Sequence, residues 1–151
     1  MSGPRDPIRL FVCHLWAEND EYARVFEYLE APGNFYYRNT AESHLKRPLD
    51  KEAQREDLRR QIAPAEVVIV TPRLYLEQPE LVAFQLTFAK AADKPVVALE
   101  FFGATDKLPK GIKDFADEVV GWNARDLTDA IRRQARHEDT TRWDTIEFKL
   151  D

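Results

Sequence analysis

The sequence EVVIVT at residues 66–71 constrains the fold of this chain more than any other segment. It is continuous, apolar and β-branched, as expected for a strand that is covered on both faces. Similar short apolar runs stand at 8–15, 94–102 and 118–123, and the aromatic sequence FYYRNT at 35–40 is typical of a further short strand. Strands of this kind occur mainly in parallel sheets that lie between two layers of helices.

Segments with helical periodicity alternate with these strands. The pattern predicts helices over 19–30, 51–65, 80–92 and 124–136, a loop over 72–79, and a loop with one helical turn over 103–117. The first helix has Asn19 or Asp20 as its cap, and Pro64 ends the second. We expect the following side chains to face the core: Tyr22, Val25, Phe26, Leu29, Leu58, Ile62, Leu127, Ala130 and Ile131.

This strict alternation predicts an α/β protein with a five-stranded parallel sheet and helices on both faces. The flavodoxin-like strand order 2-1-3-4-5 is the expected topology. We place one domain at 8–136, an N-terminal extension at 1–7 and a C-terminal tail at 137–151. In the tail, apolar and polar residues alternate in TIEFKL, a pattern typical of either an edge strand or a docking segment.

Composition excludes several classes of function. The net charge of −5 disfavours nucleic acid as a partner, because phosphate backbones require a basic surface. Neither a signal peptide nor a membrane span is indicated, and the single cysteine, Cys13, fits a reducing compartment, so we expect a cytoplasmic protein. The three histidines have no metal-ligand spacing. With five glycines and no glycine-rich phosphate motif, classical dinucleotide-binding modes are poorly supported.

In open parallel sheets, ligands bind beyond the carboxyl ends of the strands. An aromatic ring, several cationic groups and one amide converge there, which suits a nucleotide. Gln85 is unusual because it lies on an otherwise apolar stripe of its helix, where an amide needs a hydrogen-bond partner. The candidates are His14, Trp16, Arg38, His44, Arg73 and Gln85.

Each candidate also has a structural interpretation. His14 is more typical of a strand-end histidine bonded to backbone than of a base, and Trp16 is equally a packed core ring. Cys13 is more typical of a small buried hydrophobe than of a nucleophile. Arg38, Arg73 and His44 are more typical of solvated loop residues, and the pattern alone favours Gln85 as a core amide bonded to a neighbouring carbonyl.

Several segments follow the order of a known family: RLFVCHLWAEND, FYYRNTAESHLKRPLDK, LRRQIAPAEVVIVTP, FAKAADKPVVALEFFG and ADEVVGWNARDLTDAIRR. In these segments the chain resembles the bacterial and archaeal TIR-like domains, including the TIR-like component of Thoeris antiphage defence. The most specific pieces are LRRQIAPAEVVIV, KPVVAL, and VGWN before AIRR. The resemblance covers residues 8–136 and implies a TIR-like three-layer fold.

The resemblance also implies a chemistry. Enzymes of this family cleave NAD at the nicotinamide–ribose bond, and Thoeris proteins convert the ADP-ribose part into a cyclic signal for an effector protein. Their essential glutamate stands in a pattern like W-x-x-x-E, which maps onto Leu81 and Gln85 here. A glutamate would stabilise the cationic ribose of the transition state, and a glutamine lacks the required charge. Glu77 and Glu80 lie upstream and are weaker candidates for the role of this glutamate.

A second departure is the first-strand loop, which often carries serine in the family and here reads Cys13-His14-Leu15-Trp16. We therefore expect a TIR-like antiphage protein with NAD as substrate or ligand, no metal and no other cofactor. Because of Gln85, this form is inactive or ligand-trapping, whether Gln85 is natural or engineered. The alternative is a non-catalytic module that binds a nucleotide such as ADP-ribose, itself, or an effector protein. A nucleoside deoxyribosyltransferase is a weaker third option.

Overall fold

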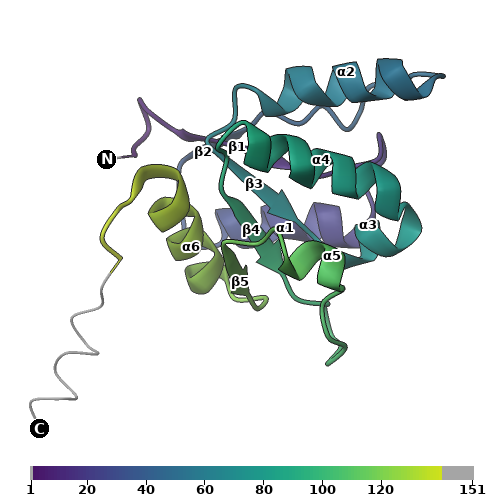
Figure 1. Cartoon of the computed structure of the whole chain (residues 1–151). Helices are drawn as coiled ribbons and strands as arrows, with labels where there is room; N and C mark the ends of the chain where they lie inside the picture. Colours follow the sequence, from purple (N-terminus) through teal and green to yellow (C-terminus); the bar gives the residue numbers. More distant parts are fainter. Residues whose placement is uncertain (1, 141–151) are drawn as a thin grey trace, which may run out of the picture.

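A five-stranded parallel sheet forms the centre of the protein, as shown by a computed structural model that describes residues 2–140 (Figure 1). The strand order is β2-β1-β3-β4-β5, which confirms the flavodoxin-like order predicted from the sequence. The strands are β1 (Ile8–Val12), β2 (Tyr37–Asn39), β3 (Val67–Val70), β4 (Val96–Leu99) and β5 (Glu118–Val120). The side chains of β3 and β4 are buried throughout, because helices cover both faces of the sheet.

Two helical layers enclose the sheet, and each has its own apolar core. Helices α1 (Asp20–Glu30) and α6 (Ala124–Arg136) cover one face. The other face is covered by α2 (Lys51–Ile62), α3 (Pro72–Glu77), α4 (Pro79–Ala91) and α5 (Lys110–Lys113). Most of the expected core side chains are buried, but Phe26 is only partly so.

Side-chain caps set the starts of three long helices. Asn19 accepts a hydrogen bond from the backbone N–H of Tyr22, which decides between the two caps predicted for α1. Asp50 caps α2 and Asn123 caps α6 in the same way. Each cap satisfies a backbone donor that has no partner within the helix.

The predicted loop over 72–79 was wrong, because this segment contains the short helix α3. Pro72 stands in its first turn, where proline costs nothing since the N–H there has no helical partner. Leu74 is buried in the core and holds the helix against the sheet. Gln78 ends α3 and caps α4, so two helices meet at one residue.

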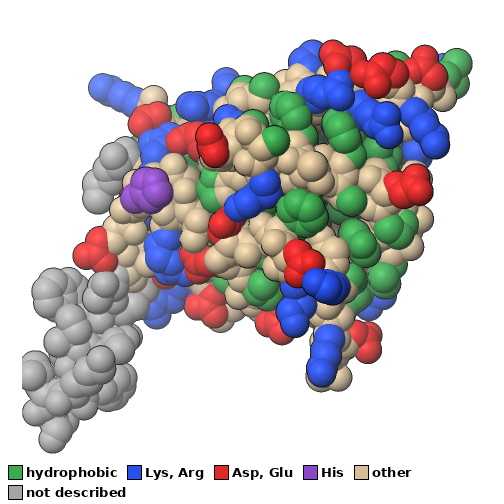
Figure 2. All heavy atoms as spheres, viewed as in Figure 1, with side chains coloured by type: hydrophobic (Ala, Val, Ile, Leu, Met, Phe, Trp, Pro, Cys, Tyr) green, Lys and Arg blue, Asp and Glu red, His purple; other side chains and the backbone are tan. Residues whose placement is uncertain are grey.

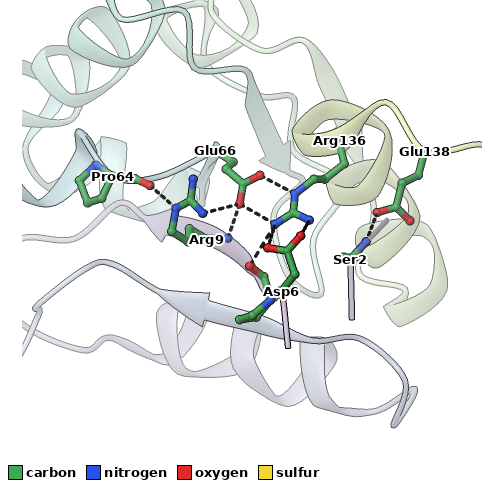
Figure 3. Close-up of polar contacts among 8 residues, drawn as sticks. Ser2, Asp6, Arg9, Pro64, Glu66, Arg136 and Glu138 are labelled. Atoms are coloured by element: carbon green, nitrogen blue, oxygen red, sulfur yellow. Dashed lines mark hydrogen bonds and ion pairs between the residues drawn. The ribbon is translucent and has the colours of Figure 1, made fainter. Parts of the chain in front are cut away.

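A network of ion pairs joins the N-terminal segment to α6 (Figure 3). Arg136 donates to Glu66 at 2.5 Å and 3.0 Å and to Asp6 at 2.8 Å and 3.2 Å. Burial alone would raise the pKa of Glu66, but hydrogen bonds from Arg136 and the Arg9 backbone outweigh it, so the pKa lies below its usual value. The network lies at the amino ends of β1 and β3, which is the edge of the sheet opposite the predicted site.

Among residues 2–140, no helix is both long enough and apolar enough to cross a membrane. The alternating segment TIEFKL, for which an edge strand or a docking role was expected, lies outside the described residues.

Candidate functional site

Gln85 lies on the sheet-facing side of α4 and is fully buried. Its Oε1 accepts a hydrogen bond from the backbone N–H of His14 at 3.2 Å. Its Nε2 donates to the backbone oxygen of His14 at 3.0 Å and to that of Leu81 at 3.4 Å. The amide therefore pairs with both backbone groups of His14, as a neighbouring strand would.

The path of the chain after β1 explains why an amide is needed here. Cys13 still donates its N–H to Ile69 of β3, at 2.9 Å, but the chain then leaves the sheet. The backbone of His14 is buried at this point, and unpaired backbone groups in such a place are costly. Gln85 replaces the missing strand, so its place on an apolar helix face has a structural cause.

His14 is itself the centre of a buried hydrogen-bond network. Its Nδ1 accepts from the backbone N–H of Trp16 at 2.9 Å, so its Nε2 carries the proton and donates to Gln61 Oε1 at 2.7 Å. Gln61 Nε2 in turn donates to Asp57 at 2.9 Å, and the indole N–H of Trp16 donates to the same carboxylate at 2.7 Å. This geometry agrees with the structural interpretation of His14 as a strand-end histidine bonded to backbone.

Burial shifts two titrations in this region. It lowers the pKa of His14, despite the opposing effects of Gln61, Asp57 and Glu42, so the neutral imidazole is favoured. It also raises the pKa of the Cys13 thiol well above its usual value. A thiol that is buried and protonated is a poor nucleophile, which agrees with its interpretation as a small core residue.

The neutral state of His14 predicts a loss of stability in mild acid. In the unfolded chain the imidazole binds a proton below about pH 6.5, whereas the folded state resists it. We expect the free energy of unfolding to fall by about 1 kcal/mol between pH 7.5 and pH 5.5, a range above the titration of carboxylates. Urea unfolding at both pH values measures this. His14→Asn keeps an acceptor for Trp16 and should be less stable but less pH-dependent; an unchanged pH slope in that variant would contradict the assignment.

The other predicted ligand residues are not all brought together. Trp16 lies beside His14 and is mostly buried. Arg73 pairs with Glu21 at 3.5 Å, on the neighbouring side of the carboxyl edge. Arg38, on the edge strand β2, and His44, in the loop that follows, are exposed.

The protein's own side chains fill the carboxyl edge at β1 and β3, where most of the ligand residues were expected, whereas the segments that follow β4 and β5 line an open pocket there. Leu15, Trp16 and Phe101 are at most 8% exposed, and Glu21 is 3% exposed. Glu21 accepts hydrogen bonds from the backbone N–H groups of Arg73 and Phe102, at 3.1 Å and 3.2 Å. It thus joins the segments that follow β3 and β4. From the sequence, it was indistinguishable from an ordinary acid in the first turn of a helix.

A groove lies nearby, between the amino-terminal halves of α2 and α4. Its volume is about 530 Å³, within the range of small-molecule sites. Figure 2 shows apolar side chains over α4 and Lys and Arg side chains of α2 beside them. The groove is lined by Arg47, Lys51, Gln54, Arg55, Gln78, Pro79, Glu80, Leu81 and Phe84.

The groove combines cationic groups with an aromatic ring. Arg47, Lys51 and Arg55 supply positive charge, and Glu80 is the one carboxylate among its lining residues. The guanidinium of Arg55 lies 5.8 Å from the centroid of the Phe84 ring. Of the residues predicted as ligand contacts, only Leu81 lines this groove; Gln85 lies behind it in the core.

Sequence reasoning missed the cations of this groove. The segment that carries Lys51 and Arg55 was predicted as a helix, and its charge pattern is that of an ordinary solvated helix. The available signal was the pair Leu81 and Phe84, two large apolar side chains three residues apart on α4 that both lie only partly within the core.

A comparison with models of known protein families gave no match. No curated protein sequence matched the chain at a significant level either. The fold is flavodoxin-like α/β, and its α2–α4 side carries a groove lined in part by cationic side chains.

Proposed function

We propose that this chain is a non-catalytic TIR-like module that binds an anionic nucleotide of the NAD or ADP-ribose class in the α2–α4 groove. The proposal combines the resemblance over residues 8–136 with the chemistry of the groove. Its setting would be antiphage defence, where such a module receives a nucleotide signal, or passes it to an effector protein, rather than producing it.

One observation carries the non-catalytic part of this proposal. The side chain in the position of the family's glutamate is an amide, and both of its ends are bonded to the backbone of His14. It offers no negative charge to a developing ribose cation, which is the requirement for cleaving the nicotinamide–ribose bond. Its side chain is also fully buried, so contact with a ribose would require breaking these hydrogen bonds.

The groove has the groups that are needed to bind a nucleotide, and binding requires no catalytic residue. Arg47, Lys51 and Arg55 are suited to the pyrophosphate of a dinucleotide. The ring of Phe84 and the side chain of Leu81 offer an apolar surface for a base or a nicotinamide. Glu80 is exposed at the start of α4 and can accept hydrogen bonds from ribose hydroxyls.

Two measurements on the purified chain test the proposal. Calorimetric titration should show binding of NAD or ADP-ribose that weakens as salt is raised, because the contacts are between charged groups near the surface. Prolonged incubation with NAD should release no nicotinamide above the spontaneous rate. Absence of binding, or sustained nicotinamide release, would overturn the proposal.

Glu80 supports a second candidate function, which is the cleavage of NAD. It is a carboxylate that lines the groove, so an NAD-cleaving activity would have to use it rather than Gln85. In that case wild-type protein releases nicotinamide and Glu80→Gln does not. Glu77→Gln, at the end of α3, is the matched control because Glu77 is not among the groove residues.

A further inference from the structure

Arg47 spans one end of the groove. It comes from the loop between β2 and α2 and is half-buried. Its Nη2 donates to Oε1 of Gln78, the cap of α4, at 2.8 Å. Its guanidinium carbon lies 5.6 Å from the centroid of the Trp16 ring. This one side chain therefore connects the loop, the start of α4 and the buried indole.

The charge of Arg47 is not balanced by a carboxylate within the described part of the chain. Its partner is the neutral amide of Gln78, and no acid of residues 2–140 lies within ion-pair distance. By contrast, Arg60 on α2 pairs with Glu42 and Asp57, both at 2.6 Å. A guanidinium has five N–H donors, so Arg47 keeps both charge and hydrogen-bonding capacity for another group.

We propose that Arg47 anchors the phosphate of the groove ligand and that Trp16 senses this contact. The inference rests on the proposed function and adds the residue that selects phosphorylated over neutral ligands. A phosphate can accept two parallel hydrogen bonds from a guanidinium, which an amide oxygen cannot match in charge or geometry. The phosphate therefore replaces Gln78 as the main partner of Arg47.

Trp16 is suited to report this exchange because its own position is fixed. Its indole N–H is bonded to Asp57 and its backbone N–H to His14. Trp16 is 8% exposed, and the guanidinium of Arg47 lies beside its ring. A displacement of the guanidinium changes the electrostatic field at the indole, and its fluorescence changes with it.

Calorimetry with ADP-ribose and with adenosine, which lacks phosphate, tests the anchor. Arg47→Gln should weaken ADP-ribose binding by about 10- to 100-fold, the range for a hydrogen bond between charged groups, and leave adenosine binding unchanged. Arg125→Gln, an exposed arginine on α6, removes the same charge away from the groove and should have no such effect. If Arg47→Gln does not fold, Arg47→Lys keeps the charge without the planar fork and should still weaken binding.

The outcomes separate this inference from the proposed function. If wild-type protein binds ADP-ribose and Arg47→Gln binds it equally well, the anchor is wrong while the nucleotide-binding proposal stands. If wild-type protein binds neither ligand, both fail. In a variant with Trp122→Phe and Trp143→Phe, Trp16 is the remaining indole. Its emission should change with ADP-ribose and not with adenosine, and an unchanged emission despite binding contradicts the role of Trp16.

Discussion

Replacing Gln85 with leucine is expected to lower the free energy of unfolding by about 3 kcal/mol, although the two side chains are similar in volume. Leucine fills the space but leaves the N–H and C=O of His14 without partners in the core. Each unsatisfied buried group costs about 1–3 kcal/mol, and the gain from burying a more apolar side chain offsets only part of this. For a domain with about 5–15 kcal/mol of total stability, the loss is large.

Urea unfolding followed by circular dichroism measures this loss. Thr87→Leu is the matched control, because Thr87 is exposed on the same helix and neighbours none of these bonds. Its change should stay within about 0.5 kcal/mol, as for most surface substitutions. A Gln85→Leu protein as stable as the Thr87→Leu control would show that the amide does not hold the end of β1.

Gln85→Glu, which would introduce the glutamate of the TIR-like domains that the sequence resembles, is expected to make stability strongly dependent on pH. A carboxylate has no donor, yet in this position it would face the carbonyl oxygens of His14 and Leu81. Only the protonated acid can donate there, so the folded state raises the pKa of this carboxyl above its usual range. A group with a raised pKa contributes its stability below the unfolded pKa, about 4.3, and loses it as the pH rises toward the folded pKa.

We therefore expect Gln85→Glu to lie within about 1 kcal/mol of wild type near pH 4.5 and about 3 kcal/mol below it at pH 8, for a shift of two to three pKa units. Thr87→Glu places the same acid on the exposed face of α4 and should show no such pH dependence. A pH-independent Gln85→Glu that also releases nicotinamide from NAD would mean that the new side chain turns out of the core. That result would favour the enzymatic interpretation of the resemblance.

The candidate site was only partly predictable because it depends on contacts between distant segments. Gln85 was recognised as anomalous from its apolar neighbours on one helix, and His14 and Trp16 were named from their place after a strand. That Gln85 and His14 bond to each other, 71 residues apart, is a property of the packed structure. Arg47 looked like one more charged loop residue, since nothing local distinguishes an unpaired arginine from a paired one.

The sequence by itself determined the fold class and the strand order. The continuous apolar runs of the strands and the 3.6-residue periodicity of the helices are local patterns, and strict alternation of strands and helices leaves few topologies that bury both. Only the tertiary structure decided what Gln85 does and where the groove lies. Folding decides which segments meet, and therefore which hydrogen-bond partners a side chain has and whether its charge is balanced. A glutamine that completes a strand end and a glutamine that binds a ligand cannot be distinguished in the sequence, because the difference lies in their neighbours.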